Sequence, residues 1–128
     1  MKRLLFLLIF LLAGGLFSNV LAQKMHLIIL DIKDSFLANP RLIVLSPKDT
    51  IQFKSINGDF DIYIPNAISF LKIKETNLKV RVNNDSNPES KKYLVQEKVE
   101  DSIITFSIYC ITNNSWPDAP PKIILVNQ

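Results

Sequence analysis

Few side chains in this sequence can do redox, metal or acid–base chemistry, and they stand far apart. Cys110 is the only cysteine and His26 the only histidine among 128 residues. A lone thiol cannot form an internal disulfide, so we expect Cys110 to be a buried packing residue, an intermolecular or redox-active thiol, or a metal ligand. Met25 and His26 together would suit copper(I), but adjacent residues of a strand point to opposite faces. We therefore expect His26 to be an ordinary strand residue.

No group of residues has the composition of an active site. The sequence lacks a serine–histidine nucleophile, a glycine-rich phosphate loop and a cluster of ligands at metal-binding spacing. Its aspartates and glutamates are scattered over separate segments. We therefore predict that the protein is not an enzyme, that it has no catalytic residues, and that it carries no cofactor.

Trp116 is the best candidate for contact with a partner. It stands in a proline-rich stretch, residues 111–121, close to Tyr109. An aromatic side chain displayed on a stiff loop is a common anchor of an interface. The alternative is that Trp116 forms a lid over one end of the domain. If it is an anchor, the partner is a protein or a glycan that the sequence does not name.

The N-terminal segment, residues 1–22, predicts a cleaved signal peptide. Lys2 and Arg3 precede an unbroken apolar run over residues 4–13, and Val20 and Ala22 supply the small residues that a signal peptidase recognises. An uncleaved membrane anchor is the alternative, although Gly14 and Gly15 interrupt the segment. We expect an exported protein, periplasmic or secreted, whose only membrane contact is through this transient segment. One domain, residues 23–128, follows.

The charge of the remaining chain argues against nucleic-acid binding. Two of the 15 basic residues and none of the 12 acidic residues lie in residues 1–22, which leaves 13 basic against 12 acidic residues. These charges are scattered singly, with Lys91 and Lys92 as the only basic doublet. A basic patch of the kind that binds nucleic acid or a membrane surface is therefore not expected.

Short, alternating, β-branched segments fill the domain, and none shows a sustained helical period. We expect the segment 25–32 to be buried on both faces, since both of its faces are apolar. Asn57-Gly58-Asp59 has the composition of a tight hairpin turn. The pattern predicts an all-β fold, a single two-sheet Greek-key β-sandwich. The predicted strands are residues 25–32, 41–45, 50–54, 60–64, 67–73, 78–82, 93–96, 102–111 and 122–127.

An apolar strand face ends at Cys110, in residues 105–110, which read Thr-Phe-Ser-Ile-Tyr-Cys. A polar loop follows, and then a last strand that begins Lys-Ile-Ile-Leu-Val. This arrangement resembles the cupredoxins, the blue-copper family that includes plastocyanin and azurin. Residues 47–53 resemble the family's Gly-Asp-x-Val-x-Phe strand, and residues 58–64 resemble the strand that carries its first histidine. The resemblance spans residues 40–128 and implies a cupredoxin-like sandwich.

The resemblance does not extend to the copper ligands. A type-1 site uses two imidazoles, a thiolate and a weak axial thioether. In the family, the second histidine and the methionine follow the cysteine in its loop, but residues 111–121 contain neither. The first-histidine position falls near Asp61. Cys110 is the one ligand-like residue left, so the sequence indicates a degenerate copper site.

Three hypotheses follow. The first is a non-catalytic cupredoxin-like module that does not bind type-1 copper and serves in binding or structure. The second is copper or redox handling through Cys110, for example at a site shared in a dimer. The third is an immunoglobulin-like module for adhesion or glycan recognition, centred on Trp116. The missing ligands favour the first.

Overall fold

The structure is a computed structural model, and it describes residues 23–127. The predicted signal peptide lies outside the described residues and stays a prediction. Among residues 23–127, no helix is long and apolar enough to cross a bilayer.

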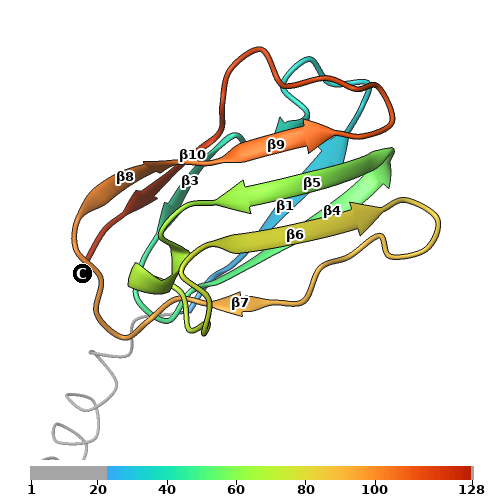
Figure 1. Cartoon of the computed structure of the whole chain (residues 1–128). Helices are drawn as coiled ribbons and strands as arrows, with labels where there is room; N and C mark the ends of the chain where they lie inside the picture. Colours follow the sequence, from blue (N-terminus) through green and yellow to red (C-terminus); the bar gives the residue numbers. More distant parts are fainter. Residues whose placement is uncertain (1–22, 128) are drawn as a thin grey trace, which may run out of the picture.

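The described chain forms two packed layers of β-strands (Figure 1). One layer has the strand order β2-β1-β4-β7, and the other contains the strand sets β6-β5-β9 and β3-β10-β8. The elements are β1 (Met25–Asp31), β2 (Ala38–Asn39), β3 (Leu42–Leu45), β4 (Thr50–Asn57), β5 (Asp59–Ile64), the helical turn η1 (Ala67–Ser69), β6 (Leu78–Asn83), β7 (Tyr93–Leu94), β8 (Ser102–Thr105), β9 (Ser107–Cys110) and β10 (Lys122–Leu125).

The two strand sets of the second layer join through one interrupted strand. β8 and β9 are separated only by Phe106, and Figure 1 shows them end to end. β8 pairs with β10, whereas β9 pairs with β5, so the strand changes neighbours at Phe106. The Phe106 ring packs edge-on against Phe53 of β4, with 6.2 Å between ring centroids. The residue that interrupts the strand therefore also ties the two layers together.

Parallel and antiparallel pairs are mixed in both layers. β1 runs parallel to β4, and β3 runs parallel to β10, while every other pair of named strands is antiparallel. Immunoglobulin-like sandwiches are built from antiparallel sheets. The pairing thus differs from the immunoglobulin-like alternative and agrees with the predicted two-sheet sandwich.

The core follows the alternation of the sequence. Residues 104–110 place Phe106, Ile108 and Cys110 inward, and their neighbours Thr105, Ser107 and Tyr109 outward, as predicted. β5 and β6 alternate in the same way, so each strand of the second layer covers the core with one face only.

Two expectations about the first layer and its connections are wrong. β1 is not buried on both faces, because Met25 and Leu27 are 49% and 39% exposed on its outer side, where no further layer packs. Asn57-Gly58-Asp59 is a tight turn, with Gly58 at φ +101°, but β4 and β5 belong to different layers. The turn therefore crosses between the layers instead of closing a hairpin.

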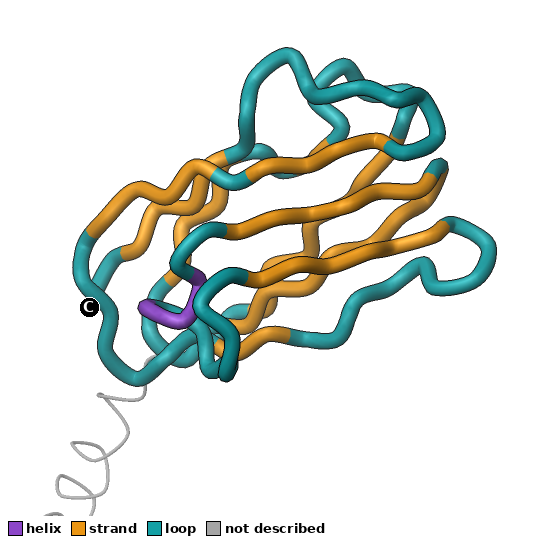
Figure 2. The backbone as a smooth tube through the Cα atoms, viewed as in Figure 1, coloured by secondary structure: helices purple, strands orange, loops and turns teal. Residues whose placement is uncertain are grey.

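The predicted strand 67–73 is also wrong. Asn66, in the left-handed region at φ 49°, starts the 3-10 turn η1, and Figure 2 shows this turn at one end of the sandwich. Ala67, Phe70 and Leu71 are all buried. Their spacing of three and four residues suits a helical turn and not a strand, whose buried residues recur every second position. Only Leu71 forms a β-bridge, to Val95.

Candidate binding groove on the outer face of the second layer

Two rows of side chains cross the outer face of β6, β5 and β9. In one row Arg81, Asp61 and Tyr109 stand directly opposite one another on the three strands. In the second row Lys79, Tyr63 and Ser107 are aligned in the same way. Their neighbours along each strand point into the core, so the outward residues form a continuous surface. Those inward neighbours are Ile62, Ile64, Leu78, Val80, Val82 and Ile108.

Arg81 and Asp61 form a bidentate ion pair in the first row. Nε and Nη2 of Arg81 donate to the two carboxylate oxygens of Asp61, each at 2.7 Å. These hydrogen bonds lower the pKa of Asp61 and raise the pKa of Arg81. Because both side chains are exposed, the pair contributes little to stability. It does hold a charged donor group and a charged acceptor group in a fixed plane on the surface.

Trp116 and Tyr109 form an aromatic corner beside this pair. The Trp116 and Tyr109 ring centroids are 4.8 Å apart, and the ring planes are inclined by 55°. The Tyr109 hydroxyl also hydrogen-bonds to the Asn114 side chain. Trp116 is 64% exposed, so it does not form a lid buried over the end of the sandwich. Much of its ring remains free for contact with another molecule.

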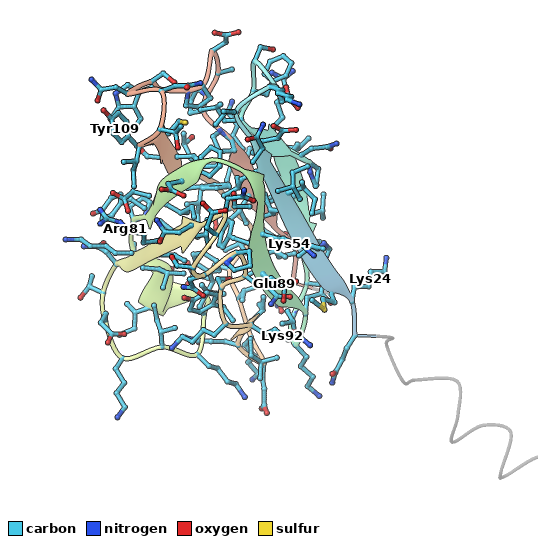
Figure 3. All side chains as sticks on the ribbon, turned by 90° about the vertical axis from the view of Figure 1, so that its right-hand side faces the viewer. Lys24, Lys54, Arg81, Glu89, Lys92 and Tyr109 are labelled. Carbon is cyan, nitrogen blue, oxygen red and sulfur yellow. The ribbon has the colours of Figure 1, made fainter. Side chains whose placement is uncertain are left out.

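The two rows and the aromatic corner line an open groove of about 430 Å³. Tyr63, 38% exposed, and Ser107 lie along it, between the aromatic corner and the basic side chains of β6. Figure 3 shows Arg81 and Tyr109 on the same side of the molecule, with Lys24 on the opposite side. The groove therefore belongs to one face of the domain.

Cys110 points away from this groove. It has no exposed surface and belongs to the hydrophobic core, opposite Phe60 of β5. Its backbone N–H donates to Ser115 O at 2.9 Å, and its carbonyl accepts from Ser115 N–H at 3.1 Å. This exchange closes a short hairpin directly after β9. In the described structure, the thiol is a packing residue that solvent does not reach.

His26 lies at the other end of the sandwich. Its Nε2 is 2.9 Å from Oδ2 of Asp49, which is buried and also accepts the backbone N–H groups of Lys24 and Ser46. Ile51, near the start of β4, pairs with His26. Asn57, at the other end of β4, leads through a turn to the end of the sandwich that carries Cys110. Six residues of strand span roughly 20 Å. His26 and Cys110 therefore cannot ligate one ion within a single chain.

The residues at the expected ligand positions do not fit a type-1 copper ion. Asp61, near the first-histidine position, is engaged by Arg81, and the loop after Cys110 contains no histidine or methionine. Across residues 23–127, no group of three or more histidine, cysteine, aspartate or glutamate side chains is placed to hold a metal. A soft site needs imidazole and thioether donors that this end of the fold does not have.

The comparisons with known proteins agree with this architecture. The two-layer sandwich is a cupredoxin-like fold, and it matches solved structures of amicyanin. A mutant of amicyanin in its reduced Cu(I) form aligns with a TM-score of 0.50 over 85% of this chain and 88% of the amicyanin chain, at 9% identity. Another reduced amicyanin mutant aligns with a TM-score of 0.49 over 83% and 86% of the two chains, at 11% identity. No family model matches the sequence, and a search of curated proteins found no match.

Sequence reasoning identified Tyr109 and Trp116 but missed the rest of the groove. Asp61, Tyr63, Lys79 and Arg81 were not predicted as contact residues, although they alternate with buried residues along β5 and β6. Each strand did show this alternation. What the sequence lacks is the register that aligns Arg81 with Asp61, 20 residues apart, and Asp61 with Tyr109.

Proposed function

We propose that this domain is an exported, non-catalytic, cupredoxin-like binding module that does not use type-1 copper. Its partner contacts the groove at Tyr109 and Trp116. The observation that carries the proposal is the 64% exposed Trp116, packed at an incline against Tyr109 at the margin of a formed groove. Exposed aromatic side chains held by their neighbours bind with little loss of conformational entropy.

Two features support a role without copper. The chain has one imidazole where a type-1 site needs two, and that imidazole is paired with Asp49 at the far end of the domain. At the groove, the Arg81 guanidinium and the Asp61 carboxylate neutralise one another as an ion pair. Neither arrangement supplies the open ligand position or the free acid–base pair that copper chemistry or hydrolysis requires.

The burial of Cys110 suits the exported location that we propose. In an oxidising compartment an exposed free thiol forms mixed disulfides or covalent dimers. A thiol with no exposed surface is protected from both reactions. The segment 1–22 would deliver the domain to such a compartment if it acts as the predicted signal peptide.

Two measurements on the domain purified from a copper-supplemented periplasm test the proposal. Metal analysis with an absorption spectrum should find no stoichiometric copper and no blue charge-transfer band. Pull-down and glycan-array signals should fall in Trp116→Ala and persist in Ile103→Ala, which removes an equally exposed apolar side chain from the outer face of β8. Bound blue copper, or equal behaviour of the two variants, contradicts the proposal.

A further inference from the structure

We infer that the groove binds an uncharged saccharide, which packs on the aromatic corner and hydrogen-bonds to the Asp61–Arg81 pair. This inference rests on the proposed function, because it names the ligand class of the same groove. It follows from three properties of the groove: its aromatic surfaces, its remaining hydrogen-bonding capacity and its charge balance.

The aromatic surfaces match the apolar faces of sugar rings. A pyranose presents C–H groups on one face, and these pack against the electron-rich face of an aromatic ring. Trp116 and Tyr109 present two surfaces inclined by 55°, and Tyr63 adds a third exposed ring in the adjoining row. The groove thus offers flat contacts at its margin and at its base.

The ion pair leaves donors and acceptors free beside these rings. Arg81 uses two of its five N–H donors on Asp61, so three remain for a ligand. Each Asp61 oxygen accepts one of these bonds and keeps a second lone pair. Sugar hydroxyls both donate and accept, so neighbouring hydroxyls can use both side chains at once. The row from Tyr109 through Asp61 to Arg81 crosses three strands, a width of roughly 10 Å.

The charge of the groove favours a neutral ligand over a polyanion. The positive charge of Arg81 is balanced by Asp61. Asp59, the next outward-facing residue of β5, also raises the pKa of Arg81. Lys79 is then the remaining cation of the groove lining. A polyanion site needs an excess of basic side chains that attracts phosphate or sulfate groups. The groove lining has two basic residues and one acidic residue, so its excess is a single positive charge.

The structure also disfavours an extended peptide. Such a ligand adds to a free sheet edge through its backbone. β6 and β9 are the two outer strands of this strand set. At the end of β6 the Asn83 N–H and C=O groups are bonded to Asn87, and at the end of β9 those of Cys110 are bonded to Ser115. Lys79 and Arg81 are the exposed side chains of β6, and charged side chains on an edge strand hinder strand addition. The groove runs across the strands and not along this edge.

Fluorescence titration tests the inference directly, because Trp116 is the only tryptophan in the chain. The probes are cellobiose, maltose and chitobiose, their longer oligomers, and heparin-derived oligosaccharides as the anionic comparison. A neutral oligosaccharide should shift the emission saturably, with little dependence on salt. Arg81→Ala should weaken this binding about tenfold or more, the loss expected for one charge-assisted hydrogen bond. Lys54→Ala, which breaks the exposed Lys54–Glu89 ion pair of 3.1 Å elsewhere on the domain, should leave it unchanged.

Each other outcome overturns the inference in a distinguishable way. Salt-dependent binding of heparin oligosaccharides alone would identify a polyanion site. Absence of sugar binding, together with Trp116-dependent capture of a protein, would refute the saccharide and leave the proposed function standing. Absence of sugar binding and of any Trp116-dependent partner would refute both. Equal losses in Arg81→Ala and Lys54→Ala would show that the sugar binds outside the groove.

Discussion

Asp49 is expected to contribute more to stability than any other carboxylate of the described domain. It is 3% exposed and accepts hydrogen bonds from Lys24 N–H at 2.9 Å, Ser46 N–H at 3.0 Å and His26 Nε2 at 2.9 Å. These bonds join the start of β1 to the turn between β3 and β4. Asp49→Ala would remove a buried acceptor from three donors at once, two of which belong to the backbone.

The cost of Asp49→Ala follows from those three bonds. A hydrogen bond to a charged group contributes about 1.5–3 kcal/mol, and water can reach part of the site beside the exposed Lys24. We therefore expect the free energy of unfolding to fall by about 3 kcal/mol and Tm by about 14 °C. Urea denaturation measures the first value and calorimetry the second. Asp101→Ala, which removes one exposed acceptor from Asn127 N–H, is the matched control and should cost less than about 1 kcal/mol.

The pH dependence gives an independent test of the same site. Burial by itself raises the pKa of Asp49, but the hydrogen bonds from Ser46, Lys24 and His26 outweigh it, so the pKa lies below its ordinary value of 3.8. The carboxylate therefore stabilises the fold fully above the unfolded pKa of about 3.9, and this stabilisation is lost as the pH falls through the lower folded pKa. The parent protein should lose stability on acidification below about pH 4, and Asp49→Ala should lose much less. Parallel acid profiles, or equal costs for Asp49→Ala and Asp101→Ala, would refute this reasoning.

Three further substitutions test other parts of the structure. Gly58→Ala should cost about 2 kcal/mol in urea denaturation, because φ is +101° and an added Cβ would lie 2.3 Å from Ile32 Cγ2; a change below about 0.5 kcal/mol would contradict the turn geometry. Cys110 should react with a thiol reagent only after unfolding, and Cys110→Ser should destabilise the domain by about 1–3 kcal/mol, since a hydroxyl replaces a buried thiol; rapid labelling of the native protein would show an open thiol. Trp116→Ala should change the free energy of unfolding by no more than about 0.5 kcal/mol, as its ring is exposed; a larger loss would show that the ring is part of the core.

The strands were predictable where one face is buried and the other is exposed to solvent. Residues 60–64, 78–82 and 104–110 alternate strictly, and the structure places each of them as expected. The failures at β1 and at the Asn57-Gly58 turn share a cause, since both depend on what packs outside the segment. β1 has two apolar faces, yet only Ile28 and Leu30 meet the other layer. The composition of Asn57-Gly58 permits a tight reversal but does not choose between a hairpin and a crossing between layers.

The groove was less predictable than the strands, because it depends on register. Arg81 and Asp61 become a pair only when β6 and β5 align residue 81 with residue 61. A shift of one residue would turn Arg81 into the core. No local pattern in either segment encodes that alignment. Trp116 and Tyr109 could be predicted from the sequence because they are only seven positions apart and a proline-rich loop joins them.

The loop after Cys110 shows how a cupredoxin-like fold can position an aromatic ring without ligands for copper. In the family that the sequence resembles, this loop carries a histidine and a methionine after the cysteine. Here Ser115 exchanges two backbone hydrogen bonds with Cys110, and the Thr112 hydroxyl accepts the Asp59 N–H at 2.9 Å. Serine, threonine and asparagine stabilise such turns through local hydrogen bonds. These bonds fix the start of the loop on β9 and β5, and Trp116 follows immediately, against Tyr109. The end of the sandwich that holds the metal in that family thus presents, in this chain, an exposed aromatic surface whose position is maintained by hydrogen bonds of the loop.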